Sequence, residues 1–169
     1  TAVIVGADAV MLSDETANGR YPIEAIKIMN RIIRYTQENS TVRAQFTDRG
    51  EYSMIEAISA TIIDLAQKVG ARAIVAETQT GVTAIAISAW RSKLPLIIVT
   101  PEKRVAQQLA LLYSSQTYVR PADKYAATKL SEYLQAEHIF SKGDIVVTAS
   151  GKYAGTPGGT DTIKVRVLE

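Results

Sequence analysis

The stretch AIVAETQTGVTAIAISAWRSKLPLIIV (residues 73–99) decides the fold. It opens and closes on two short, unbroken apolar runs, AIVA at 73–76 and LIIV at 96–99. Such runs are typical of strands that helices cover on both faces. Between them, residues 83–90 have the composition of a helix. A strand, a helix and a second strand in this order predict two parallel strands joined by a crossover helix.

The alternation of helix and strand continues on both sides of this stretch. Upstream, apolar residues at steps of three and four predict a helix over 55–69, which Gly70 ends as a C-terminal cap. Downstream, the pattern predicts a helix, a weak strand, a helix and a strand, over 105–112, 117–119, 127–134 and 145–149. The fold class is therefore α/β, with a mainly parallel sheet and helices on both faces.

The last strand has a different pattern. Over Ile163–Val167, apolar residues alternate with Lys164 and Arg166, which predicts a strand with one wet face. A glycine-rich loop, with no helix, connects it to the strand before it. Because a parallel neighbour would need a crossover, we expect this last strand to be antiparallel and to lie at an edge of the sheet.

The N-terminal part predicts one further strand and helix. The apolar run Ala9–Leu12 is interpreted as a buried strand, and Pro22 opens a helical pattern. The polar stretch 37–50 that follows has little core character. We place a domain boundary there, which divides the chain into residues 1–40 and 41–169.

Composition narrows the classes of function. The 169 residues are 47% hydrophobic and 21% charged, with a formal charge of +2 and scattered cations, which argues against a nucleic-acid partner. There is no Cys and only one His, His138, so we expect no metal site of thiolates or several histidines. No apolar run reaches the length of a membrane span, so no membrane partner is expected. A start at Thr1, inside an apolar stretch, predicts a fragment.

Three loops could carry chemistry. Ser13–Thr16 follows the first predicted strand, where it could line a polar cavity or simply cap a helix. Glu77–Thr83 leads into a helix N-terminus, a place where anions bind, and Ser150–Thr160 is rich in glycine. If the strands before the last two loops are neighbours, both loops face one crevice and form an anion site. The alternative is a capped helix and a plain connecting loop.

Several blocks of the sequence resemble the pyruvate kinase family. GADAVMLSDETANGRYPIEAIKIM (6–29) is similar to the segment that ends the catalytic barrel of that family, although Asp14 replaces a common Gly. Four further blocks resemble the C-terminal domain in order and spacing: ARAIVAETQTGVTA, LIIVTPEKRVAQQLAL, KGDIVVTA and GTPGGTDTIKV. The resemblance implies that residues 1–40 are a remnant of a (β/α)8 barrel, its last strand and helix, and that 41–169 are the allosteric C-terminal domain.

The resemblance also implies an activity for the full-length protein. Pyruvate kinases transfer a phosphoryl group from phosphoenolpyruvate to ADP in glycolysis, with Mg²⁺ and usually K⁺, as cytoplasmic homotetramers. The metal ligands and the Lys that contacts the phosphoryl group would precede Thr1, so we expect this chain alone to be inactive and to hold no metal. Only Ser13 and Glu15 match residues that line the nucleotide side of the catalytic site.

In the family, phosphorylated effectors bind between two loops of the C-terminal domain. By match, the effector site comprises Thr78, Gln79, Thr80, Gly81 and Thr83, closed by Gly155, Thr156, Pro157, Gly158 and Gly159. Gln79 and Val82 stand where members activated by fructose 1,6-bisphosphate often have cations. Glu137 aligns with an Arg of some animal members. The expected partners are therefore a monophosphate effector and further copies of the chain.

Two other classes of protein compete with this interpretation. A freestanding effector-binding domain without kinase activity would have no use for the barrel remnant Ala9–Asn39. An unrelated nucleotide-binding protein would need a phosphate loop after its first strand, yet neither GxGxxG nor GxxxxGK[ST] occurs. The mass of the encoded full-length product separates the family interpretation from the freestanding domain.

Overall fold

The computed structural model divides the chain into two units, Thr1–Gln45 and Phe46–Glu169. It describes residues 1–40, 50–151 and 159–169. The division falls between residues 41 and 49, outside the described part, so the boundary that the sequence suggested after residue 40 stays a prediction. Each unit is considered by itself.

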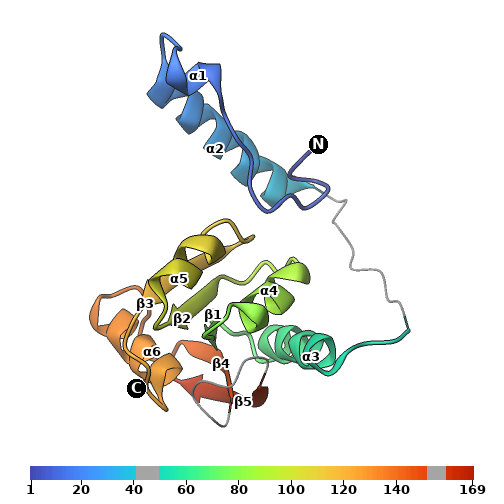
Figure 1. The fold of residues 1–169 in the computed structure, drawn as a ribbon, viewed down its shortest axis with the longest axis vertical. Helices are drawn as coiled ribbons and strands as arrows, with labels where there is room; N and C mark the ends of the chain where they lie inside the picture. The colour runs from blue at the N-terminus through green and yellow to red at the C-terminus, as the bar shows by residue number, and fades with distance from the viewer. Residues whose placement is uncertain (41–49, 152–158) are drawn as a thin grey trace. The chain divides into compact units, whose positions relative to one another are not determined.

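A five-stranded sheet forms the centre of the second unit, with the strand order β3-β2-β1-β4-β5 (Figure 1). Its elements are α3 (Met54–Lys68), β1 (Ala73–Glu77), α4 (Val82–Ala89), β2 (Leu96–Thr100), α5 (Lys103–Leu109), β3 (Ser115–Val119), α6 (Ala126–Ala136), β4 (Ile145–Gly151) and β5 (Thr160–Val167). Strands β1 to β4 pair in parallel, and β5 pairs antiparallel with β4 at the sheet's edge. The predicted class, the mainly parallel sheet and the antiparallel last strand are confirmed.

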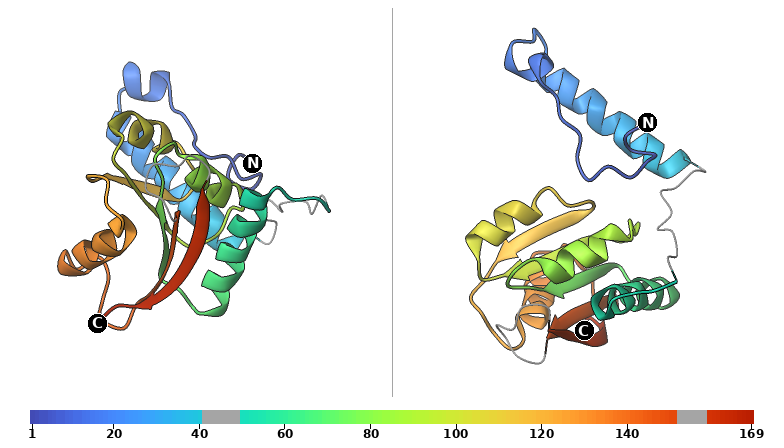
Figure 2. Two further views of the ribbon diagram at one scale, coloured as in Figure 1. Left: turned by 60° about the horizontal axis from the view of Figure 1, so that its bottom comes forward. Right: turned by 45° about the vertical axis from the view of Figure 1, so that its right-hand side comes forward.

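Helices cover both faces of this sheet. On one face, Ile62 of α3, Ile87 of α4 and Leu109 of α5 pack against alternate residues of the strands. On the other face, Leu130 and Leu134 of α6 pack against the residues in between. Figure 2 shows α6 on one side of the sheet and α3 on the other. The central strands are therefore buried on both faces, which explains their unbroken apolar sequences.

Local signals fix the ends of α3. The Ser53 hydroxyl accepts a hydrogen bond from the Glu56 N–H at 3.4 Å, and the Glu56 carboxylate accepts one from the Ser53 N–H at 2.8 Å. This reciprocal pair is a capping box. At the other end, Gly70 has a φ of +64°, the left-handed conformation of a helix C-terminus, so its predicted role as a cap is confirmed.

The first unit contains α1 (Asp14–Ala17) and α2 (Pro22–Asn39). The helix predicted from Pro22 is confirmed, but the buried strand predicted over Ala9–Leu12 is wrong, since these residues form no strand and Met11 is 87% exposed. A strand needs a neighbour for its N–H and C=O groups, and residues 1–40 contain no second strand to supply one. Four isoleucines of α2 also stay about half exposed: Ile23, Ile26, Ile28 and Ile32.

Candidate functional site: the carboxyl edge of strands β1 and β4

The chain reverses its order across the sheet between β1 and β4. From β1, the chain moves outward through β2 to β3, then returns through α6 to β4 on the other side of β1. Strands β1 and β4 are parallel neighbours, with Ala73 opposite Val146 and Ala76 opposite Ala149. The segments that follow the two strands therefore both leave from the carboxyl ends of the strands, which is where open α/β sheets bind ligands.

The segment after β1 is a tight turn. The N–H of Gly81 donates to the Thr78 hydroxyl at 2.9 Å, and the Thr78 N–H donates to the Val99 carbonyl at 3.0 Å. Gly81 has a φ of +90°, which turns the chain directly into α4. Thr78 is only 5% exposed, whereas Thr80 is exposed at the tip of the turn. Of the predicted hydroxyls, Thr80 is thus the one that reaches solvent most freely.

The N-terminus of α4 lacks a side-chain cap. The first hydrogen bond of the helix runs from the Ile85 N–H to the Gly81 carbonyl at 2.9 Å. The N–H groups of Val82, Thr83 and Ala84 precede it, and no described side chain accepts from them as a cap. These groups carry the positive end of the helix dipole. The first turn of α4 can therefore hold an anion.

The N-terminus of α6 also lies at the carboxyl ends of the strands, but on the face of the sheet opposite to α4. An acidic side chain of the protein, that of Glu77, already contacts it. Burial raises the pKa of Glu77 above its ordinary value of 4.5, a hydrogen bond from the Ala127 N–H lowers it, and the Asp123 carboxylate raises it. The Glu77 carboxylate thus accepts a hydrogen bond from the first turn of α6. Its Oε2 atom is buried and has no hydrogen-bond partner among the described residues. Of these two helix N-termini, only that of α4 is open to an external anion.

Glu77 should make stability depend on pH. Because the pKa of Glu77 is raised in the folded state, ionising this carboxyl lowers the free energy of unfolding. The loss is absent below pH 4.5, where Glu77 is protonated in both states, and it is complete above the raised pKa of the folded state. We expect Glu77→Gln, which keeps an acceptor for Ala127, to raise Tm by about 1–4 °C at pH 7.5 and by less near pH 4.5. Thermal unfolding from pH 4 to 8 measures this, with the exposed Glu132→Gln of α6 as control. An equal effect at every pH would contradict the assignment.

A buried pair of hydroxyls joins α4 to the segment after β4. The Oγ1 atoms of Thr83 and Thr160 lie 2.5 Å apart, and both residues are 4% exposed. Thr160 begins β5 opposite Gly151, the last residue of β4. A Cβ atom at Gly151 would lie 2.5 Å from the Gly159 carbonyl oxygen, so glycine permits this close approach. The predicted residues Gly155, Thr156, Pro157 and Gly158 lie outside the described part of the chain.

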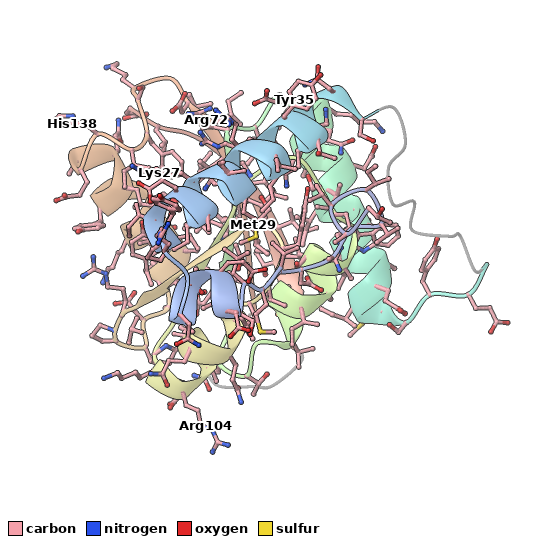
Figure 3. All side chains as sticks on the ribbon, turned by 90° about the horizontal axis from the view of Figure 1, so that it is seen from above. Lys27, Met29, Tyr35, Arg72, Arg104 and His138 are labelled. Carbon is pink, nitrogen blue, oxygen red and sulfur yellow. The ribbon has the colours of Figure 1, made fainter. Side chains whose placement is uncertain are left out.

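The other candidate residues lie elsewhere. The Glu15 carboxylate accepts from the Ser13 N–H at 3.0 Å, and its own N–H and that of Ser13 lower the pKa of Glu15. Both residues are exposed in the first unit, where their contacts are those of a helix start. His138 is exposed just beyond α6, with a φ of +59°, and Figure 3 shows it projecting outward, as does Arg104 of α5.

Glu137, which aligns with an Arg of some animal members, lies at the end of α6 that is far from Glu77. Glu137 is the C-cap of α6, whose N-terminus is the end beside Glu77. A helix of 11 residues is about 16 Å long, so Glu137 lies at the opposite edge of the sheet. Acidic residues nearer the carboxyl ends of the strands include Glu77 and Asp123, and also Glu102 after β2 and Asp161 at the start of β5. A match in one sequence cannot reveal this, because it ignores the direction in which the helix runs.

Metal ligation and membrane insertion find no support in the described residues. Among residues 1–40, 50–151 and 159–169, no three His, Asp or Glu side chains gather where they could hold a metal ion. No described helix has both the length and the apolar character to cross a membrane.

Comparison with known proteins identifies the family. Residues 56–166 match the model of the family described as pyruvate kinase, alpha/beta domain. The chain is 34% identical over 171 residues to pyruvate kinase 2 of Synechocystis sp. and 36% identical over 174 residues to a pyruvate kinase of Corynebacterium efficiens. Each alignment covers 99% of this chain, but 29% and 35% of those relatives.

A solved structure gives the same result. A pyruvate kinase from Cryptosporidium parvum matches with a TM-score of 0.85 and 25% identity, over 99% of this chain and 34% of that one. The match covers nearly the whole chain, while the chain spans about a third of the length of the curated relatives it matches. The chain therefore belongs to the pyruvate kinase family, whose alpha/beta domain it contains.

Proposed function

We propose that the chain is the regulatory part of a longer pyruvate kinase, which transfers a phosphoryl group from phosphoenolpyruvate to ADP in glycolysis, with Mg²⁺ and K⁺, in the cytoplasm. The names of its relatives and its coverage of about a third of their length support this proposal. The mass of the full-length product in a cell extract, with fractionation of that extract, tests it. A full-length product of about 18.3 kDa would favour the alternative, a freestanding effector-binding domain.

On its own, the 169-residue chain should not catalyse the reaction. Phosphoryl transfer requires cations around the transferring oxygens. Ser13 and Glu15, which resemble residues on the nucleotide side of the catalytic site, supply no such charge and make only local contacts. A coupled assay with phosphoenolpyruvate, ADP, Mg²⁺ and K⁺ should find no turnover. Activity that persists after removal of the host enzyme would contradict this.

The proposed regulatory site is the N-terminus of α4, where a phosphate group would bind. The uncapped first turn of α4 carries the proposal, since it follows the turn after β1, at the carboxyl ends of the neighbouring strands β1 and β4. Thr78, Gln79, Thr80, Gly81 and Thr83 would surround the phosphate. The exposed hydroxyl of Thr80 would add one charge-assisted hydrogen bond.

Replacing Thr80 tests the site. We expect Thr80→Ala to weaken the binding of inorganic phosphate by roughly 5- to 20-fold, because one hydrogen bond to a charged group is lost. Titration followed by amide chemical shifts or calorimetry measures this. Thr61→Ala is the matched control, since the Thr61 hydroxyl donates within α3 to the Ala57 carbonyl at 2.9 Å. Phosphate binding that is unchanged by Thr80→Ala would count against the site.

A monophosphate should be preferred over a bisphosphate. The Glu77 carboxylate lies at this end of the sheet, and a second phosphate that approached it would meet like charge, whereas the Asp123 carboxylate is paired with Lys129. We expect a sugar or nucleoside monophosphate to bind more tightly than fructose 1,6-bisphosphate. Parallel titrations with both ligands decide, and a preference for the bisphosphate would refute the proposed specificity.

Self-association is proposed as the second role of this part. Strand β5 is at the edge of the sheet, and its residues Val165 and Val167 are 44% and 61% exposed. An edge strand with apolar side chains can pair with another copy of itself, and the family resemblance implies a homotetramer. Light scattering over a concentration series should show dimers or larger species. A monomeric mass at high concentration would contradict the proposal.

A further inference from the structure

One hydrogen bond connects the first turn of α4 to a distant part of the chain. The Thr83 and Thr160 hydroxyls are 2.5 Å apart and 77 positions apart in sequence. Several other hydroxyls on the helices bond to a carbonyl one turn back in their own helix: Thr36 to Ile32, Ser59 to Ile55, Thr61 to Ala57 and Ser131 to Ala127. Ser88, also on α4, instead donates to the Tyr113 carbonyl outside its helix at 3.1 Å. Thr83 is the second residue of α4, so it has no helical turn behind it. Its hydroxyl is used between elements instead.

The first turn of α4 needs such support. The helix has eight residues, follows the left-handed Gly81 and has no side-chain cap. Short helices are marginally stable by themselves, and their first turns fray. The N–H groups of Val82, Thr83 and Ala84 can hold one anion together only if the turn keeps its geometry.

Thr160 is well placed to give that support. It is the first residue of β5 and pairs with Gly151 of β4. Strand β4 in turn pairs with β1. Since α4 follows directly from the turn after β1, the Thr83–Thr160 hydrogen bond closes a ring of contacts through α4, β1, β4 and β5. Both residues are only 4% exposed, so water competes little for the hydrogen bond.

We propose that Thr160 is a positioning residue of the anion site, whose hydroxyl holds Thr83 and thereby fixes the first turn of α4 around a bound phosphate. The inference rests on the proposed phosphate site. It assigns a role to a residue of β5 that, on this proposal, does not touch the ligand. If the Thr160 hydroxyl donates to Thr83, the Thr83 hydroxyl keeps its own proton and can still donate to a bound phosphate.

Titration of the 169-residue chain with inorganic phosphate tests the proposal. We expect Thr160→Val, which has the same shape but no hydroxyl, to raise the Kd roughly 5- to 20-fold. Thr160→Ser, which keeps the hydroxyl, should stay within about twofold of the unmodified chain. The matched control is Thr162→Val on the same strand, since the Thr162 hydroxyl donates to the neighbouring Asp161 carboxylate at 2.7 Å.

A double variant identifies the route of the effect. Thr83→Val removes the same bond from the other side, so Thr83→Val with Thr160→Val should bind phosphate no more weakly than the weaker single variant. If Thr160→Val does not fold, the comparison of Thr83→Val with Thr160→Ser gives the same test. All titrations are made well below the Tm of each variant, so that lost stability alone does not change the Kd.

The outcomes separate this inference from the proposed site. Phosphate binding that Thr80→Ala weakens and Thr160→Val leaves unchanged would overturn the role of Thr160 and keep the site. Weakening by Thr160→Ser as large as that by Thr160→Val would show that keeping the hydroxyl does not keep the affinity, and would overturn the role of the hydroxyl. No binding of phosphate by the unmodified chain would overturn both.

Discussion

An Ile74→Ala variant is expected to lose about 3–5 kcal/mol of its unfolding free energy, which is the largest effect of any substitution considered. Ile74 is fully buried in the central strand β1, between Leu96 of β2 and Val147 of β4. Its side chain belongs to the core that α3, α4 and α5 cover. Removing most of the side chain leaves a cavity that a sheet paired on both sides cannot close.

Urea unfolding followed by circular dichroism measures this loss, from the midpoint and the slope of the transition. Ile85→Ala is the matched control, since Ile85 lies on α4 and is 51% exposed. We expect it to change the unfolding free energy by no more than about 0.5 kcal/mol. Similar losses in both variants would mean that β1 is not the centre of the core.

The buried strands of the sheet could be predicted because their sequence pattern fits one type of structure. The runs at 73–76 and 96–99 are apolar at every position, which suits a strand between two layers of helices. The alternation at 163–167 suits an edge strand with one wet face, and β5 is that strand. In both cases, the pattern along the chain reports directly which faces are buried.

Elements that depend on distant pairing were predicted less well. The sequence indicated a weak strand at 117–119, but β3 begins at Ser115, where it pairs with Leu96 of β2. Likewise β5 begins at Thr160, three residues before its apolar pattern starts, because that segment pairs with the end of β4. The run Ala9–Leu12 shows the reverse case, since a strand-like sequence forms no strand where residues 1–40 provide no neighbour.

The strand order beside the candidate site was predictable, but the contacts there were not. The expected convergence of two loops follows from strand order alone, and β1 and β4 are indeed neighbours. The bond between Thr83 and Thr160 spans 77 positions, and no periodicity reports it. Glu77 was noticed only as part of a loop, because its contact with the first turn of α6 depends on how that helix returns across the sheet.

Gly81→Ala should impair stability and phosphate binding together. Gly81 has a φ of +90°, which costs alanine about 1–2 kcal/mol, and a Cβ atom there would lie 3.0 Å from Cδ2 of the buried Leu109. We expect a total loss of about 1–3 kcal/mol in unfolding free energy. The turn can relieve this strain only by moving the Gly81 N–H away from Thr78, which displaces the first turn of α4.

Gly70→Ala separates the two causes of that loss. Gly70 also has a left-handed backbone, with a φ of +64°, but a Cβ atom there would meet nothing within 4 Å. Gly70 precedes β1, so it lies at the amino ends of the strands, away from the anion site. It should therefore lose about 1 kcal/mol from the backbone alone and keep its affinity for phosphate. Gly81→Ala should bind phosphate at least about tenfold more weakly, since three N–H groups move together. Urea unfolding and phosphate titration of both variants give the comparison, and equal phosphate affinities would show that the turn at Gly81 does not shape the anion site.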